Sequence, residues 1–435
     1  MKFHLLSSLL VLVLVSLQCY PQVTVLIGKS NETIYPITPN ETTDLTDLIP
    51  LETLFKNKQV IGMGEATHGT KEFFNTKAKM FKFLVTHCGY TVFSIEATYG
   101  GTLKVNDYVL YGKGDVLTVM KSMEFWTWDT EEVKDLIEWM KSYNDGKHDN
   151  EKLKFYGFDC QSFKGPTNAL VDYVKEVDKQ NVDKFLKGLS VLNDSSYLYF
   201  YSLNSDKSSQ GRIAQIHEII TFIQQWFQEN ENFYISSSGR TKFELARYNI
   251  ENLNQTLFLR GSPEQKYGLL RDSLMAHNIK WILEQEQEKV FVWAHNGHIG
   301  KTLSFDKQGA CMGMYLDRWF GHGYYNIGFV FNEGSFQAIT KTTGKPAEFT
   351  VPEYNKNTLT NALVNSCPDA FFIDLTNSNN KLFRSSRRTY YIGAAFIQEY
   401  WSRYSKSITA KNQFNGLIFI HTTSRAVPIN RKKTN

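Results

Sequence analysis

Residues 59–69, QVIGMGEATHG, begin with a short apolar run and end in a polar loop between glycines. The run over residues 59–64 predicts a buried strand, and residues 71–87 continue with apolar side chains at helical spacing on one face. Residues 90–95, 130–143 and 153–158 repeat this order of strand, helix and strand. The alternation predicts an α/β fold, with a mostly parallel central sheet flanked by helices.

The pattern changes over residues 166–287. Long polar-rich helical stretches are expected there at 209–231, 242–258 and 265–287, with no good strand between them. Strands are expected again at 290–294, 324–332, 370–373 and 417–420. The sequence therefore predicts a helical insertion or lid at 166–287 between two halves of an α/β core, residues 51–165 and 288–435. Residues 23–50, with three prolines, are expected to form an extended lead-in.

The N-terminus carries the pattern of a secretion signal. Lys2 precedes an uncharged, mostly apolar run from Leu5 to Leu17, which at 13 residues is shorter than the roughly 20 that a membrane helix needs. We therefore predict a signal peptide over residues 1–22 and a secreted or periplasmic protein, with lipid anchoring at Cys19 as the alternative. No later segment has the length and apolarity of a membrane helix, so no integral membrane segment is expected in the mature chain.

Composition excludes several classes of protein. The net charge of +4 is spread over 435 residues without an uninterrupted basic tract, so nucleic acid is not expected as a partner. Five cysteines without CxxC spacing indicate neither a disulfide scaffold nor a zinc knuckle. The hydrophobic share of 42% fits a globular chain with a packed core.

Ionisable residues follow several of the predicted strands. Because ligand sites of open α/β sheets lie past the carboxyl ends of the strands, these side chains are expected to converge on one rim. They are Glu65, His68, Glu96, Asp159, His295, His298, Asp374 and His421.

The loop after the first strand carries the candidate catalytic pair. His68 is expected at the N-terminus of the following helix, where the helix dipole favours a neutral imidazole, the form that a general base requires. Glu65 could orient the ring or hold the attacking water. The alternative is structural, with Thr67 as a helix cap and His68 as a hydrogen-bonded core ring. The spacing of a phosphate-binding loop is absent.

The second candidate segment is WAHNGH, residues 293–298. His295, Asn296 and His298 could donate hydrogen bonds to a developing oxyanion. Two histidines three residues apart could also bind a metal, with Glu65, Glu96 or His68 as a third ligand, or the segment could be a structural turn. No GxSxG motif occurs anywhere in the chain, so activation of water by histidine is favoured over a serine nucleophile.

Several of these segments carry a family resemblance. GMGEATHGTKEFF at 62–74, FSIEATYGG at 93–101, RDSLMAHNIKWIL at 271–283 and FVWAHNGHIGK at 291–301 are the main ones. With VNDYVLYGKGD, MEFWTWDTEEVKDLIEWMKSYN and FYGFD between them, they occur in the order found in the erythromycin esterase family, which the chain resembles from about residue 58 to 335.

The resemblance implies an α/β core with a helical lid over a deep cleft, and hydrolysis of a macrolactone ester by water that a histidine activates. His68 resembles the family's general base and Glu65 its neighbour, while Glu96, His295 and His298 resemble supporting pocket residues. Lys77 stands where the family often has arginine, and lysine lacks the planar fork that clamps an oxyanion at two points.

We therefore predict a hydrolase of small-molecule carboxylic esters or lactones that uses no cofactor. His68, Glu65 and His295 are the predicted catalytic residues. The supporting or substrate-binding residues are Glu96, Lys77, His298, Asn296 and Asp159. Two alternatives stay open, a hydrolase that binds a divalent metal with the same cluster and a non-catalytic binding protein of the same fold.

Overall fold

The computed structural model describes residues 22–189, 192, 207–303, 309–351, 358–364 and 368–429. The predicted signal peptide, apart from Gln22, lies outside the described residues, and so does Cys19. No helix in the described part of the chain is both long and apolar enough to cross a bilayer.

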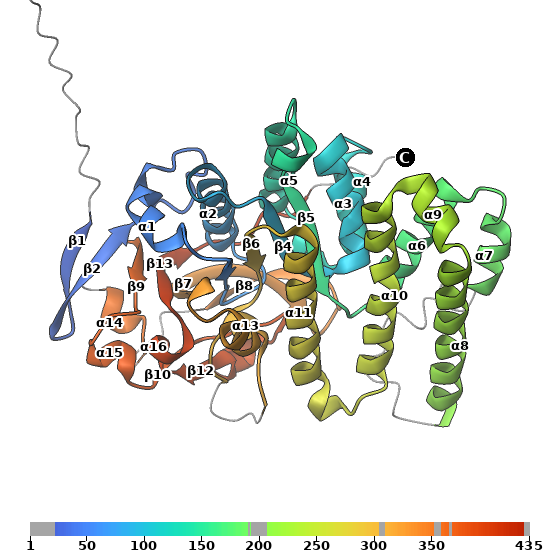
Figure 1. Ribbon diagram of the computed structural model, residues 1–435. Helices are drawn as coiled ribbons and strands as arrows, with labels where there is room; N and C mark the ends of the chain where they lie inside the picture. The colour runs from blue at the N-terminus through green and yellow to red at the C-terminus, as the bar shows by residue number, and fades with distance from the viewer. Residues whose placement is uncertain are drawn as a thin grey trace, which may run out of the picture.

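One large mixed sheet forms the centre of the molecule (Figure 1). Its eleven strands follow the order β1-β2-β9-β13-β7-β3-β6-β4-β5, with β8 and β11 paired to β7. The strands are β1 (Val23–Ile27), β2 (Ser30–Pro36), β3 (Val60–Met63), β4 (Val92–Thr98), β5 (Lys154–Asp159), β6 (Val290–Trp293), β7 (Tyr324–Thr340), β8 (Pro346–Val351), β9 (Ala370–Asp374), β11 (Ala395–Phe396) and β13 (Gly416–Thr423). A separate two-stranded sheet pairs β10 (Arg387–Tyr390) with β12 (Ser405–Ile408).

The helices are α1 (Glu52–Phe55), α2 (Lys71–Cys88), α3 (Tyr99–Tyr111), α4 (Val116–Met120), α5 (Glu131–Asn144), α6 (Lys164–Val177), α7 (Val182–Gly188), α8 (Lys207–Glu229), α9 (Glu231–Ser238), α10 (Arg240–Arg260), α11 (Glu264–Glu286), α12 (Asn296–Ile299), α13 (Met312–Phe320), α14 (Asn361–Val364), α15 (Lys381–Arg384) and α16 (Ala410–Gln413). Five of them, α2, α5, α8, α10 and α11, were predicted, and their ends lie within two residues of the predicted ones. The predicted α/β class, with a mostly parallel sheet between helices, is confirmed.

The two faces of the sheet separate the core into two layers. Side chains alternate along a strand, so Ile61 and Met63 of β3 join one apolar cluster and Val60 joins the other. The first cluster includes apolar side chains of α2 and α5, and the second includes those of α11 and α13. The parallel strands are covered on both faces, which explains why each is a nearly continuous apolar run.

The region predicted as a helical insertion divides into two parts. Helices α6 to α10 share an apolar cluster of their own, and Figure 1 shows α7, α8 and α9 at the end of the molecule beyond β5. Helix α11, by contrast, packs on the sheet through Met275, Ala276 and Ile279. It therefore belongs to the layer that covers the strands.

The N-terminal lead-in forms part of the sheet. Residues of β1 and β2 pair as an antiparallel hairpin, and β2 pairs antiparallel with β9. Ile27 and Ile34 are fully buried in this hairpin. The extended conformation expected for residues 23–50 thus holds over the two strands, and their pairing extends the sheet at one edge.

The prediction that Asp374 joins the rim of the site was wrong. Strand β9 runs antiparallel to β13, so Asp374 at its end lies opposite Gly416, the first residue of β13. Asp374 accepts a hydrogen bond there from Tyr325 Oη (2.9 Å), at the amino end of β7. His421 does not join the cluster either, because its Nδ1 lies 3.4 Å from Asp369 Oδ1. A short apolar run carries no signal of strand direction.

Candidate functional site

The loop between β3 and α2 places a carboxylate against an imidazole. Nδ1 of His68 donates to Oε1 of Glu65 across 2.7 Å. Glu65 is fully buried, whereas the His68 side chain keeps 13% of its surface exposed. A Cβ at Gly64 would lie 2.1 Å from Asn296 Oδ1, so only glycine lets the loop approach the turn after β6 this closely.

Lys77 of α2 occupies the far side of the same carboxylate. Its Nζ donates to Oε2 of Glu65 across 2.5 Å, and Trp293 Nε1 donates to that oxygen across 3.0 Å. Burial, only partly offset by Glu65, lowers the pKa of Lys77 to about 8. Both oxygens of Glu65 therefore have donors from the protein, and the contact of Oε1 orients the His68 ring. Lys77 itself is fully buried behind Glu65.

His295 lies directly beside His68, with 5.0 Å between the ring centroids. Its Nε2 donates to the carbonyl oxygen of Ile392 (3.1 Å), and its Nδ1 accepts from the Gly297 N–H (3.1 Å). Burial, with smaller contributions from the nearby histidines, holds the pKa of His295 well below its usual value. The ring is thus neutral, and both nitrogens are occupied by the backbone, which leaves no free N–H for an oxyanion.

Glu96 links this pair to a second group of charges. Its Oε2 accepts from the backbone N–H of His295 (3.0 Å), and its Oε1 accepts from Arg271 Nη2 (2.6 Å). Burial alone would raise the pKa of Glu96, but the nearby His298 and Arg271 cations hold it well below its usual range. Arg271 also binds Asp159 at two points, through Nε (3.0 Å) and Nη2 (2.8 Å).

His298 lies between two carboxylates. Its Nδ1 bonds to Oδ1 of Asp272, and its Nε2 lies 3.3 Å from Oε1 of Glu96. Burial alone would lower the pKa of His298, but these carboxylates raise it to about 10. His298 is therefore an imidazolium at neutral pH, and both of its nitrogens carry protons.

Asn296 has a structural role in place of the expected oxyanion contact. Its Nδ2 donates to the carbonyl oxygen of Phe329 (2.7 Å), and its Oδ1 accepts from the Phe329 N–H (3.0 Å). The side chain thus pairs with β7 as a strand residue would. It ties the turn after β6 to the sheet.

Seven of the predicted residues therefore meet in one connected cluster at the carboxyl ends of β3, β4, β5 and β6. They are Glu65, His68, Lys77, Glu96, Asp159, His295 and His298. Sequence reasoning missed Arg271, Asp272 and Tyr391. The segment RDSLMAHNIKWIL contains the first two and was noted for its resemblance, but no strand end marks it.

A cavity of about 230 Å³ opens beside the cluster. His295, His298, Asp272, Tyr391 and Lys406 are among the residues that line it. The ring of Tyr391 packs edge-on against His295, with 4.9 Å between centroids. Within the described residues, no three histidine, cysteine, aspartate or glutamate side chains are arranged to hold a metal ion.

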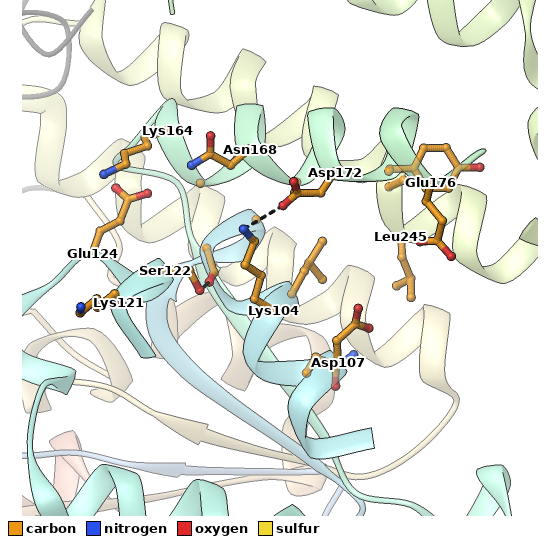
Figure 2. Close-up of a pocket in the computed structure, with 18 of the residues that line it drawn as sticks. Lys104, Asp107, Lys121, Ser122, Glu124, Lys164, Asn168, Asp172, Glu176 and Leu245 are labelled. Atoms are coloured by element: carbon orange, nitrogen blue, oxygen red, sulfur yellow. Dashed lines mark hydrogen bonds and ion pairs between the residues drawn. The ribbon is translucent and has the colours of Figure 1, made fainter. Parts of the chain in front are cut away.

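A second cavity, of about 260 Å³, lies between α3, α6 and α10 (Figure 2). Lys104 and Asp172 form an ion pair of 2.9 Å across its middle, and both side chains are about half exposed. Glu124 at one end accepts a hydrogen bond from Ser162 Oγ (2.5 Å). None of the described residues that line it is a histidine, and none also lines the first cavity. The first cavity is lined by His295 and His298, and His68 lies behind His295, with 5.0 Å between the ring centroids.

The fold and the cluster together define an α/β protein whose buried carboxylates and histidines meet at the carboxyl ends of a parallel sheet. The family model described as erythromycin esterase matches residues 85–423, and the chain belongs to the erythromycin esterase family. The resemblance stated from the sequence is confirmed. Membership supports hydrolase activity. Glu65, His68 and Lys77 precede the matched segment, so their roles are argued from the geometry above.

The chain is also similar to individual proteins over most of its length. It is 26% identical over 410 residues to YbfO of Bacillus subtilis (strain 168), named as a candidate hydrolase, with 88% of each chain covered. It is 24% identical over 343 residues to erythromycin esterase type II of Escherichia coli, covering 73% of this chain and 80% of that one. A crystal structure of a Bacillus cereus protein matches with a TM-score of 0.76 at 25% identity, covering 91% of this chain and 97% of that one.

Proposed function

We propose that this protein hydrolyses a carboxylic ester or lactone of a small molecule, with His68 as the general base. One observation carries the proposal. Nδ1 of His68 bonds to the buried Glu65, and its Nε2 has no hydrogen-bond partner among the residues that the structure describes. A neutral imidazole with one nitrogen oriented by a carboxylate and the other free is the arrangement that accepts a proton from water.

The reaction follows from this arrangement of the His68 ring. Nε2 of His68 takes a proton from water as the hydroxide attacks the carbonyl carbon and forms a tetrahedral intermediate. When the ester C–O bond breaks, the His68 imidazolium returns that proton to the departing alkoxide, so the products are an acid and an alcohol. Glu65 stabilises the transient imidazolium, and Lys77 donates to Glu65 from behind.

The oxyanion needs a positive field that His295 does not supply, because the backbone occupies both nitrogens of that ring. His298 lines the cavity as a cation, and Arg271 Nη1 lies 3.3 Å from it. We assign the stabilisation of the tetrahedral oxyanion to the positive field of these two cations and not to a direct hydrogen bond from His298, since both nitrogens of that ring already face carboxylates. His295 is assigned to packing against His68, which keeps the ring of the base in place.

A panel of esters and lactones tests the proposal, with erythromycin included because two relatives of the chain are named erythromycin esterases. Wild type and His68→Ala are assayed side by side before and after dialysis against a chelator. We expect hydrolysis of at least one ester by wild type, unchanged by dialysis. His68→Ala should lower kcat by about 10²–10⁴-fold, the usual contribution of a general base.

His277→Ala is the matched control, because His277 is an exposed histidine of α11 that does not line the catalytic cavity. Its activity should equal that of wild type. Activity that is lost on dialysis and restored by a divalent ion would replace the proposal with the metal-dependent alternative. No turnover on the whole panel, with a ligand that still raises Tm, would favour the non-catalytic binding protein.

We further propose that the enzyme acts outside the cytoplasm, on the pattern of residues 1–22. Expression of the full chain followed by cell fractionation tests this. Protein found in the medium or periplasm and shortened at its N-terminus is the expected result. Full-length protein in the cytosol would contradict it.

A further inference from the structure

The chain that follows β13 runs beside the loop between β3 and α2, which carries the proposed base. We call residues 424–429 of this chain the clasp. Arg425 of the clasp forms an antiparallel bridge with Thr70, and the Ala426 N–H donates to the Gly69 carbonyl oxygen (3.0 Å). The backbone of the clasp thus bonds to the loop immediately after the base.

Gly69 is also held by β7. Its carbonyl oxygen accepts a second hydrogen bond from the Gln337 N–H (2.9 Å). A Cβ at position 69 would lie 2.4 Å from the Gln337 carbonyl oxygen, so only glycine permits this close contact between loop and strand. Arg425 donates to the side-chain oxygen of Gln337 through Nε (2.9 Å) and Nη2 (2.5 Å). The clasp, β7 and the residue after His68 therefore form one bonded unit.

A buried glutamate fastens the clasp to α2. The carboxylate of Glu72 accepts from both the backbone N–H (2.7 Å) and the hydroxyl (2.6 Å) of Ser424. Only 6% of Glu72 is exposed, so water competes little for these bonds to a charged acceptor. Glu72 lies in the first turn of α2, four residues after His68. Its bonds to the clasp therefore fix the point where the loop of the base enters the helix.

The far end of the clasp makes an equivalent contact with α5. The Val427 N–H donates to both carboxylate oxygens of Glu132 (3.0 and 3.2 Å), and Glu132 is likewise 6% exposed. Glu72 and Glu132 are each the second residue of their helix. The two glutamates therefore match in helix position, burial and kind of partner, but only Glu72 adjoins the loop of the base.

We infer that Glu72 is a positioning residue for the proposed reaction, and that its bonds to the clasp hold the His68 ring where it can take a proton from water. The inference rests on the proposed function of the same site. The bond from Nδ1 of His68 to Glu65 orients the ring, but the place of the ring depends on the backbone that carries it. Displacement of a reacting group by about 1 Å can cost about 10²-fold in rate.

Two substitutions of the same kind test the inference. Glu72→Met and Glu132→Met each leave one N–H of the clasp without its acceptor, and each should lower Tm by a few degrees. On an ester that wild type hydrolyses, Glu72→Met should lower kcat by about 10–100-fold and leave KM almost unchanged. Glu132→Met should leave kcat and KM within about three-fold of wild type. Glu72→Gln should restore most of the rate, because the amide can accept from the Ser424 N–H and donate to its hydroxyl.

The double variant Glu72→Met/His68→Ala separates positioning of the base from general support of the fold. If Glu72 acts through His68, its substitution should cause no further loss of kcat once the imidazole is absent. Damage to the fold would instead lower the residual rate by the same factor in both backgrounds. Ser424→Ala removes only the hydroxyl bond and should give a smaller loss of kcat in the same direction, which keeps the test available if Glu72→Met does not fold.

A chemical probe of the ring tests the inference without any ester. Diethyl pyrocarbonate modifies neutral imidazoles, and mass spectrometry of the digested protein assigns the modification to His68. The His68 side chain is 13% exposed while its loop is held. A loosened loop should expose more of the ring, so the modification rate should rise in Glu72→Met and stay at the wild-type value in Glu132→Met.

The outcomes separate this inference from the proposed function. Equal losses of kcat in Glu72→Met and Glu132→Met, or a further loss in the double variant, would overturn the role of Glu72 and leave the ester hydrolase in place. No hydrolysis of any ester by wild type would overturn the proposed function itself. The modification rate would then decide whether Glu72 holds the ring, and an unchanged rate in Glu72→Met would overturn that role as well.

Discussion

The two cavities have similar sizes, about 230 and 260 Å³, but the ionisable groups around them are arranged differently. In the cluster beside the catalytic cavity the carboxylates of Glu65, Glu96 and Asp159 are almost completely buried, and each bonds to more than one donor. In the helical cavity Lys104 and Asp172 form a simple pair that is about half exposed. Volume alone therefore does not mark the site. Buried charges that share partners do.

The physical reason is desolvation. A buried charge is costly unless it is paired, and pairs that share members must keep a fixed geometry. An exposed pair is screened by water and contributes little to either stability or geometry. A substitution of a buried charge in the cluster should consequently lower stability and activity much more than a substitution of an exposed charge in the helical cavity.

Glu65→Gln should have the largest effect. The amide cannot accept from His68 and Lys77 as two carboxylate oxygens do, so the ring of the base loses its orientation and the imidazolium loses its counter-charge. We expect kcat to fall by about 10²–10⁴-fold on an ester from the panel. Because the two residues act as a unit, Glu65→Gln/His68→Ala should be no slower than His68→Ala alone. Losses that multiply in the double variant would show that the residues act independently.

Arg271→Met should be the most damaging of these substitutions to stability. It leaves the buried carboxylates of Glu96 and Asp159 without their main cation. Removal of one partner of a buried pair costs about 3–5 kcal/mol, and urea denaturation measures this directly. Lys280→Met on the same helix is the control, since Lys280 is exposed, where it pairs with Glu284 and lies over the Trp319 ring. Equal losses in the two variants would contradict the contrast between buried and exposed charges.

Much of the fold could be predicted from the sequence, because buried parallel strands and amphipathic helices leave strong periodic patterns. Strands β3, β4, β5 and β6 and helices α2 and α5 begin and end near their expected positions. The direction of β9 could not be predicted, since an apolar run reads the same in either orientation. The packing of α11 on the sheet could not be predicted either, because its sequence has the same polar-rich helical pattern as the neighbouring helices.

The site could be predicted as far as strand ends define it. Glu65 and His295 come after β3 and β6, and Glu96 and Asp159 lie near the carboxyl ends of β4 and β5. These four strands run in parallel, so topology alone brings the residues together. Arg271 comes from a helix and Tyr391 from the chain after β10, so their approach depends on tertiary packing that no local pattern encodes. Asn296 is the opposite case. Its position in the sequence predicted a role in the site, but its side chain bonds to the backbone of Phe329.

A pH series on His298→Gln sharpens the comparison. The pKa of His298 is about 10 in the folded protein and about 6.5 in an unfolded chain, so the folded state binds the proton more tightly. Its stabilising contribution is complete below about pH 6.5 and is lost as the pH rises toward about 10. The difference in unfolding free energy between wild type and His298→Gln should therefore shrink between pH 6 and pH 9, measured by urea denaturation. A difference that stays constant would show that His298 is not held as a cation.

Lys104→Met should have the smallest effect, although residues at one end of the helical cavity lie near residues of the site. Ser162, which donates to Glu124 at one end of that cavity, lies three residues after Asp159, and Trp128 of the neighbouring loop donates to the Glu96 carbonyl oxygen. Lys104 forms an ion pair with the half-exposed Asp172 (Figure 2) and bonds to neither of these residues. Its loss should cost about 0–1 kcal/mol in unfolding free energy and leave kcat unchanged. A large loss of kcat with an unchanged Tm would mean that the helical cavity affects catalysis directly. The exposed pair contributes too little to stability to lower kcat by unfolding the protein.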